Sequence, residues 1–203
     1  MRQLARDGIS LAFQDVGRGA PPILLIHDRG CDHTTFYQQI EHFRNNHRVV
    51  AVDLRGHGES GGCIGDQTPG DLAADLAWLC FELGIHMPAV VGHGLGGAVA
   101  MELAIRHPAL PAAVVALDTK IAPAEETDSD RHHLTGPCEP PLLFVDASGD
   151  GANLGYLREI CPRVTVSTFE EAGHQVHLEW PEQINALIDS FLSRTRREEA
   201  ESR

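Results

Sequence analysis

The sequence predicts a single α/β domain with a mostly parallel central sheet and helices on both of its faces. Its 203 residues suit one domain and are enough to bury a sizeable core. Strand-like and helix-like segments alternate from residue 23 to residue 192, which is typical of parallel strands joined by crossover helices. The run Ile23–Ile26 is apolar throughout, as expected for a strand that is buried on both faces.

The individual elements follow in order along the chain. Two strands over residues 2–6 and 9–16 are joined by the turn pair Asp7-Gly8, which predicts a hairpin. After the strand at 23–26 we expect a helix over 34–44, a strand over 48–53, a helix over 71–83, a strand over 88–91, a helix over 96–107, strands over 113–117 and 142–145, a helix over 154–160, a strand over 163–169 and a last helix from Trp180-Pro181. The domain is expected to cover residues 1–193, with a short surface loop over 122–140 and a charged tail over 194–203 that frays.

Composition excludes several classes of function. The formal net charge is -13, from 16 basic and 29 acidic side chains, which disfavours binding to nucleic acid or to anionic membranes. The first residues contain no apolar signal segment, and no apolar run is long enough to span a membrane. The five cysteines are odd in number and form no C-x-x-C pair. We therefore expect a cytoplasmic protein with reduced cysteines, acting on a small molecule; the oligomeric state stays open.

Several motifs, in a fixed order, resemble those of one large family. Gly92-His93-Gly94-Leu95-Gly96 resembles a nucleophile elbow, the tight strand-to-helix turn usually written G-x-S-x-G. The loop over residues 53–60 and the histidine-containing loop over residues 171–179 occur in the expected places before and after it. With the strand ends near His27 and over residues 144–150, the likeness covers nearly the whole chain. The sequence is similar to the α/β-hydrolase superfamily, in its esterase, lactonase and haloperoxidase-like group.

This resemblance implies specific roles for several residues. His174 falls at the catalytic histidine, and Asp150 at the acid that orients it. Gly94 falls at the position of the nucleophile, which makes it unreactive because glycine has no side chain. The backbone amides of Leu95 and Arg29 are expected to be the oxyanion donors.

Two further features depart from the family pattern. The family usually has His-Gly where this chain has His27-Asp28, and a carboxylate at residue 28 would repel an oxyanion unless Arg29 or solvent neutralises it. Only about two dozen residues separate Leu117 from Pro141, where relatives commonly insert a helical cap. A missing or minimal cap predicts a shallow site that is open to water.

Other side chains are weaker candidates for the missing nucleophile. His93 directly precedes Gly94, but strand alternation directs it elsewhere, and the resemblance implies a packed histidine there. From the same resemblance we count His93 and Asp28 among the oxyanion and substrate-binding residues. Cys31 and Cys63 lie in loops that can line the same edge of the sheet, although an idle cysteine is the commoner outcome. The histidines show no metal-ligand spacing, so we expect neither a metal nor a cofactor.

Three functional hypotheses remain open at this stage. In the first hypothesis, the chain is a hydrolase-like enzyme that acts on a small carbonyl, ester-like or aromatic substrate without a serine. It would use a His174–Asp150 dyad, with His174 as general base. Alternatively it is a non-catalytic binding protein that kept the fold, with the dyad as a relic. In the third hypothesis it is a serine esterase whose nucleophile was deliberately replaced by glycine. A Gly94→Ser variant assayed on a simple ester separates the three.

Overall fold

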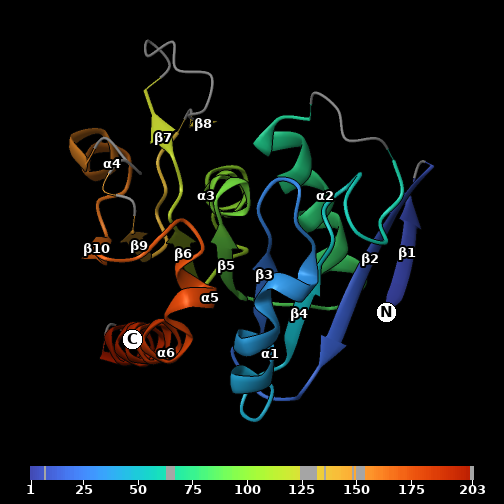
Figure 1. The fold of residues 1–203 in the computed structure, drawn as a ribbon, viewed down its shortest axis with the longest axis horizontal. Helices are drawn as coiled ribbons and strands as arrows, with labels where there is room; N and C mark the ends of the chain where they lie inside the picture. The colour runs from blue at the N-terminus through green and yellow to red at the C-terminus, as the bar shows by residue number, and fades with distance from the viewer. Residues whose placement is uncertain are drawn as a thin grey trace.

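The chain folds around one eight-stranded sheet. A computed structural model describes residues 1–6, 8–62, 67–123, 132–134, 136–147, 149 and 154–201. The strand order is β1-β2-β4-β3-β5-β6-β9-β10; the pairs β1-β2 and β2-β4 are antiparallel and all other neighbours are parallel (Figure 1). The mostly parallel sheet predicted from the alternating pattern is therefore confirmed.

The strands lie close to their expected positions. They are β1 (Arg2–Arg6), β2 (Ile9–Val16), β3 (Ile23–Ile26), β4 (Val49–Val52), β5 (Ala89–His93), β6 (Ala113–Leu117), β9 (Leu142–Asp146) and β10 (Val164–Thr168). Two short strands, β7 (Ile121–Ala122) and β8 (His132–His133), form a separate parallel pair. In the described part of the chain, this pair is the regular structure found between β6 and β9, where a cap would be inserted.

Helices cover both faces of the sheet. They are η1 (His33–Phe36, a 3₁₀ helix), α1 (Tyr37–Phe43), α2 (Pro69–Glu82), α3 (Leu95–Arg106), α4 (Leu154–Ile160), α5 (Val176–Glu179) and α6 (Pro181–Glu201). Figure 1 shows α1, α5 and α6 on one face and α2, α3 and α4 on the other. Helix α2 begins two residues earlier than predicted, because Thr68 and Asp71 form a capping box and Pro69 occupies the first turn.

Each face of the sheet has its own apolar core. One core packs the sheet against α2 and α3, with Leu76 and Val99 fully buried. The other packs the sheet against α1 and α6, with Phe43 and Ile188 buried. Because the central strands are apolar on both faces, they are held rigidly between these two layers, and their carboxyl ends form a fixed platform.

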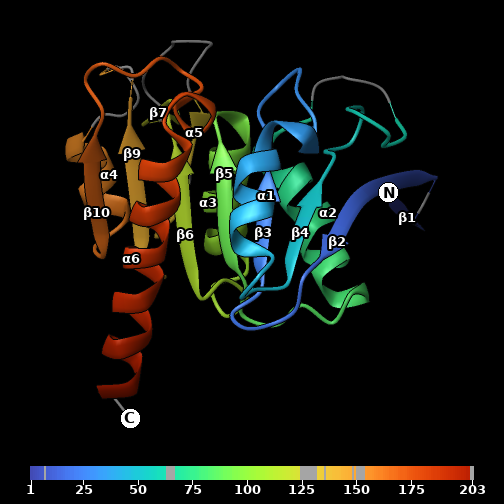
Figure 2. The ribbon, with the colours of Figure 1, turned by 60° about the horizontal axis from the view of Figure 1, so that its bottom comes forward.

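Helix α6 differs from the expectation for the C-terminus. It continues to Glu201, although we expected the chain to fray from residue 194. Figure 2 shows it extending beyond the lower edge of the sheet. The Arg194 guanidinium donates to Thr165 Oγ1 in β10 at 3.2 Å, and Arg163, directly before β10, lies 3.6 Å from Glu198. These two contacts connect the last turns of α6 to β10. No helix in the described part of the chain is long and apolar enough to cross a membrane.

Candidate active site

The site lies at the carboxyl ends of three adjacent strands. Asp28 follows β3, Gly94 follows β5 and Asp118 follows β6, while His174 comes from the loop between β10 and α5. Parallel strands end at the same edge of a sheet, which brings segments distant in sequence together. A cavity of about 310 Å³ opens there, and its lining is Asp28, Arg29, Gly94, Leu95, Asp118, Lys120, His132 and His174.

The turn at Gly94 has the geometry of a nucleophile elbow. Gly94 has φ 53° and ψ -117°, a left-handed conformation that is strained for residues with a side chain, and α3 begins at the next residue. Close packing requires glycine at residue 96 as well, since a Cβ there would lie 2.6 Å from the backbone oxygen of His27 and closer still to that of Ile26. The turn therefore places residue 94 at the top of the sheet, as expected, and presents bare backbone there.

The Asp28 side chain fills the space that a nucleophile at residue 94 would occupy. A Cβ built on Gly94 would lie 2.7 Å from Asp28 Oδ2 and closer still to Oδ1. Asp28 Oδ1 accepts a hydrogen bond of 2.6 Å from the Leu95 backbone amide, the donor expected to face an oxyanion. The Asp28 carboxylate therefore occupies the position expected for an oxyanion, and in this arrangement the Leu95 amide is already used by a side chain of the protein.

Two carboxylates hold the imidazole of His174. Its Nδ1 lies 2.6 Å from Asp118 Oδ2, and its Nε2 lies 2.9 Å from Asp28 Oδ2. The hydrogen bond to Asp118, followed by that to Asp28, raises the pKa of His174 to about 9. At neutral pH the ring is therefore an imidazolium that donates from both nitrogens.

The Asp28 carboxyl is ionised for the complementary reason. Burial alone would raise its pKa, but hydrogen bonds from His174 and from the Leu95 amide outweigh burial and lower the pKa well below its usual value. The resting site is thus a row of carboxylate, imidazolium and carboxylate with a net charge of about -1. This differs from a working serine triad, in which the histidine must start as a neutral base.

Asp118 is the acid that the structure places on His174, and sequence reasoning missed it. It is buried, and its Oδ1 accepts a 3.1 Å hydrogen bond from the Ala147 amide, which fixes the carboxylate. The predicted acid, Asp150, lies outside the described residues, so its role stays a prediction. One signal pointed to Asp118: it directly follows the apolar strand β6, which pairs with the elbow strand β5.

The remaining predicted site residues support or line the cavity. His93 is buried, and its Nε2 donates to the backbone oxygen of His174 at 2.8 Å, so it positions the histidine loop. The exposed Arg29 lines the cavity, and its backbone amide hydrogen-bonds the Asp28 carboxylate. Cys31 is half-buried, is not part of the cavity lining, and has a pKa raised by burial, which keeps it a thiol. Cys63 lies outside the described residues.

Among the described residues, two groups of side chains have the spacing of metal ligands. In the first group, Asp28, His93 and His174 bring ligand atoms within 4.8 Å of one another. His93 Nε2 donates to the backbone oxygen of His174, and both ring nitrogens of His174 contact carboxylates, so these atoms already have partners within the protein.

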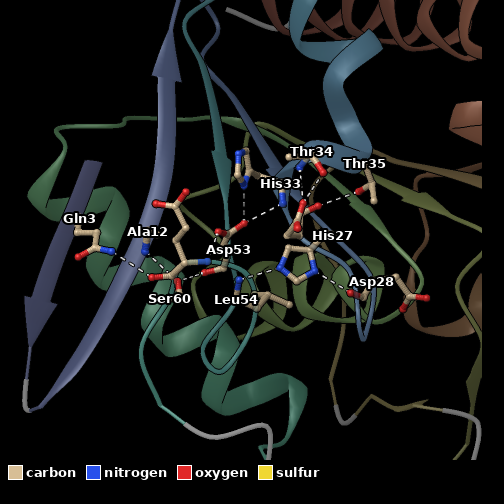
Figure 3. A network of polar contacts seen from close by, with 12 residues as sticks. Gln3, Ala12, His27, Asp28, His33, Thr34, Thr35, Asp53, Leu54 and Ser60 are labelled. Carbon is tan, nitrogen blue, oxygen red and sulfur yellow. Dashed lines mark hydrogen bonds and ion pairs between the residues drawn. The ribbon is translucent and has the colours of Figure 1, made fainter. Parts of the chain in front are cut away.

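The second group of possible ligands, Asp32, His33 and Asp53, is part of a structural network (Figure 3). The fully buried Asp53 accepts hydrogen bonds from the His33 amide and ring and from the Glu59 amide. Figure 3 also shows His27 between the Leu54 amide and the Asp28 backbone, with the Asp28 side chain directed away from it. This network fixes the β3 and β4 loops and thereby aims Asp28 at the elbow.

Fold, elbow and histidine loop together define a protein of the α/β-hydrolase class. Residues 21–136 match the family model described as alpha/beta hydrolase fold, and the chain belongs to that family. A putative non-heme haloperoxidase from Mycobacterium phage D29 is 32% identical over 75% of this chain and 57% of its own length. The acetyltransferase component of the acetoin cleaving system of Cupriavidus necator is 36% identical over 50% of this chain.

Solved structures agree on the fold. A thermophilic esterase from Thermogutta terrifontis superposes with a TM-score of 0.81 at 22% identity, covering 96% of this chain and 99% of the esterase. The chain spans only 27% and 57% of the length of the Cupriavidus and phage relatives. Their activities therefore do not transfer as whole proteins.

Proposed function

We propose that this chain is a hydrolase-type enzyme that works without a serine nucleophile, with His174 transferring protons between Asp28, the substrate and water. The observation that carries the proposal is the pair of contacts that His174 makes within one cavity, 2.6 Å to Asp118 and 2.9 Å to Asp28. Membership of a family of hydrolase fold supports it. In general acid–base catalysis, a histidine commonly lies between a buried acid, which orients it, and the group that reacts.

The protonation state of the site refines the chemistry. With a pKa of about 9, His174 begins the reaction as an acid, and it becomes a base only after its Nε2 proton has left. This differs from a site that starts with a free general base. A histidine that starts as an acid favours substrates in which a bond to an oxygen atom breaks while that oxygen gains a proton.

Simple ester hydrolysis by a serine mechanism does not suit this site. Gly94 offers no nucleophile, and the Leu95 amide already binds Asp28 Oδ1. The cavity of about 310 Å³ is at the small end of ligand sites, and Arg29 and Lys120 line it. We therefore propose a small, polar substrate rather than a bulky one.

The test is a turnover screen on the chain and two variants. Small esters, lactones, aldehydes and epoxides are incubated with wild type, His174→Gln and Asp118→Asn, and products are measured by mass spectrometry. Loss of the general acid–base is expected to lower the rate of the true substrate by about 10²–10⁴-fold. His42→Gln is the matched control, because His42 forms an exposed pair with Asp189 at 2.7 Å, away from the cavity. Turnover that is equal in all four proteins would refute the proposal.

A second candidate is a non-catalytic binding protein. The observation that favours it is that one side chain, Asp28, takes both the nucleophile's space and the oxyanion donor. In that case a ligand found by thermal-shift screening would bind wild type and His174→Gln with similar affinity, and neither protein would convert it.

A further inference from the structure

We propose that a second ligand site lies at the opposite edge of the sheet and binds a free monocarboxylate with an apolar chain of medium length, such as octanoate. The proposal goes beyond the proposed function, because it involves neither His174 nor the cavity at the elbow. It rests on an apolar cavity of about 430 Å³ at the amino ends of the central strands.

The cavity forms where three parallel strands begin. Ile23 in β3 pairs with Ala89 in β5, and Ala89 pairs with Ala113 in β6, so the segments that precede these strands meet at one edge of the sheet. Figure 2 shows α6 passing this lower edge, and Leu192 of α6 adds to the cavity lining. Alanine is the first residue of both β5 and β6. These small side chains leave space that larger ones would fill.

Most of the lining is apolar. Apart from three polar side chains, it consists of alanine, proline, methionine and leucine. Several polar groups around it already have partners. The Ala89 amide donates to the Pro22 backbone oxygen at 2.8 Å, and the Ala112 amide to that of Pro88 at 2.9 Å. The Thr195 hydroxyl donates to the backbone of its own helix, α6, at 3.1 Å. Water in the cavity would therefore find few partners, and an apolar group could displace it at little cost.

The charged part of the lining selects an anion. Arg196 lines the cavity, and its guanidinium donates from Nη1 to the Ala20 backbone oxygen at 3.5 Å, which ties it to the loop before β3. Nε and Nη2 take no part in that bond, and the planar guanidinium matches the two oxygens of a carboxylate. His86 adds a second nitrogen-containing side chain, and none of the described residues that line the cavity is acidic. An arginine without a neighbouring acid in the lining favours a carboxylate ligand.

Met87 gives the cavity an adaptable apolar wall. Its φ of 48° lies in the left-handed region, which is strained for a residue with a side chain and is often found at ligand sites. Its side chain is a large apolar group that stays 48% exposed. A ligand in the cavity would cover it and remove apolar surface from water, and the flexible thioether can adjust to the shape of an alkyl chain.

An apolar interior with one arginine fits an amphipathic carboxylate better than a purely apolar or a purely charged ligand. The volume of about 430 Å³ lies within the usual range of small-molecule sites. The formal net charge of -13 opposes approach to an anionic membrane. The free acid in solution is therefore the ligand, rather than the headgroup of a lipid in a bilayer.

The test uses the methionines as reporters. The chain has three, Met1, Met87 and Met101, so protein labelled with ¹³C in the methionine methyl groups gives three methyl signals by NMR. Met87→Leu assigns the signal of Met87. Octanoate, added below its micelle-forming concentration, should shift the Met87 signal until it saturates. The signal of Met101, which is buried in the core on the other face of the sheet, should not move.

Two analogues test the two parts of the ligand. Butyrate keeps the carboxylate and loses most of the apolar chain, whereas octan-1-ol keeps the chain and loses the charge. Each should bind at least about 10-fold more weakly than octanoate, because one of the two interactions is lost.

Variants test the lining. Arg196→Gln should weaken octanoate binding by roughly 10-fold and leave octan-1-ol binding unchanged. Arg197→Gln is the matched control, because Arg197 is the next residue of α6 and is not part of the lining. Ala112→Leu fills the cavity and should abolish binding of both ligands, while an unchanged Met101 signal shows that the variant is folded.

Four outcomes would overturn the proposal. In the first, the Met87 signal does not move with octanoate. In the second, all three signals move together without saturation, which indicates unspecific binding of a surfactant. In the third, octanoate and octan-1-ol bind equally well and Arg196→Gln has no effect, which excludes carboxylate recognition. In the fourth, the Met87 signal moves with protein concentration alone, which identifies a second copy of the chain as the occupant. None of these outcomes affects the turnover screen, which tests the opposite edge of the sheet.

Discussion

The carboxylate of Asp28 and a side chain at residue 94 compete for the same space. A Cβ on Gly94 would lie 2.7 Å or less from the oxygens of Asp28, and Asp28 holds the Leu95 amide. The two departures from the family pattern, at residues 28 and 94, are therefore one structural change rather than two.

This competition predicts that serine cannot be restored by a single substitution. Gly94→Ser should lose about 3 kcal/mol of stability, through steric conflict and left-handed backbone strain, and should not hydrolyse p-nitrophenyl acetate. The double variant Gly94→Ser/Asp28→Gly frees the space and the amide, and leaves the introduced serine in line with His174 and Asp118. Its hydrolysis of the ester should exceed that of wild type by roughly 100-fold or more. Adding Asp118→Asn is the control and should remove the gain; a folded double variant without any gain would contradict the prediction.

A pH titration of His174 tests the row of charges. The pKa of about 9 means that the folded protein binds a proton on His174 that the unfolded chain has lost by then. The stabilisation of the folded protein by this proton is therefore fully present below about pH 6.5, the pKa of an unperturbed histidine. It is lost as pH rises through about 9. In NMR spectra, the Cε1 proton of His174 should titrate near pH 9, and at lower pH in Asp28→Asn, because one carboxylate charge has gone. A titration near 6.5 in wild type would show that the two contacts do not form in solution.

Buried His177 predicts sensitivity to acid. Burial, together with the charges of His93 and His174, lowers the pKa of His177 to about 3, and its ring packs 4.7 Å from that of Phe36. The unfolded chain binds this proton already below pH 6.5, so stability should fall between pH 6.5 and 3, by up to about 1.4 kcal/mol per pH unit. In urea unfolding at pH 7.5 and 5.5, His177→Phe should lose less stability than wild type between the two pH values. Equal losses would mean that His177 is not buried and neutral.

The close packing of the elbow predicts an effect of adding one methyl group. Gly96→Ala should cost about 3 kcal/mol, because the new Cβ meets the backbone oxygens at the end of β3. Gly61→Ala is the matched control: there the nearest atom would be Ser10 Cβ at an ordinary 3.5 Å, and the change should be within about 0.5–1 kcal/mol. Chemical denaturation of both variants measures the difference, and similar midpoints would refute the packing argument.

The sequence predicted the architecture well because its signals are local. Apolar runs, glycine and proline boundaries and capping residues located the sheet strands and the long helices to within a few residues, except at the C-terminal end of α6. The short helix α5 and the persistence of α6 past residue 194 were missed, since both depend on packing against other elements.

The site was only partly predictable, for a physical reason. The elbow and His174 are tied to motifs with fixed spacing, so their placement followed from the chain order. The role of Asp28 depends on which way one side chain turns, and the choice of Asp118 depends on which strands are neighbours. Residue types along the chain do not fix the direction of the Asp28 side chain, and Asp118 is indicated only by its position directly after β6. An aspartate directly after the strand beside the elbow is the signal to look for in similar sequences.

The lining of the cavity at the elbow carries charges of both signs. Asp28 and Asp118 share the imidazolium of His174, whereas Arg29 and Lys120 add positive charge to the same lining. A ligand with an anionic end and an uncharged reactive end would thus be attracted by the basic side chains and repelled by the carboxylates, and both forces turn it the same way. Orientation of such a molecule would be set before any contact with Asp28 is made.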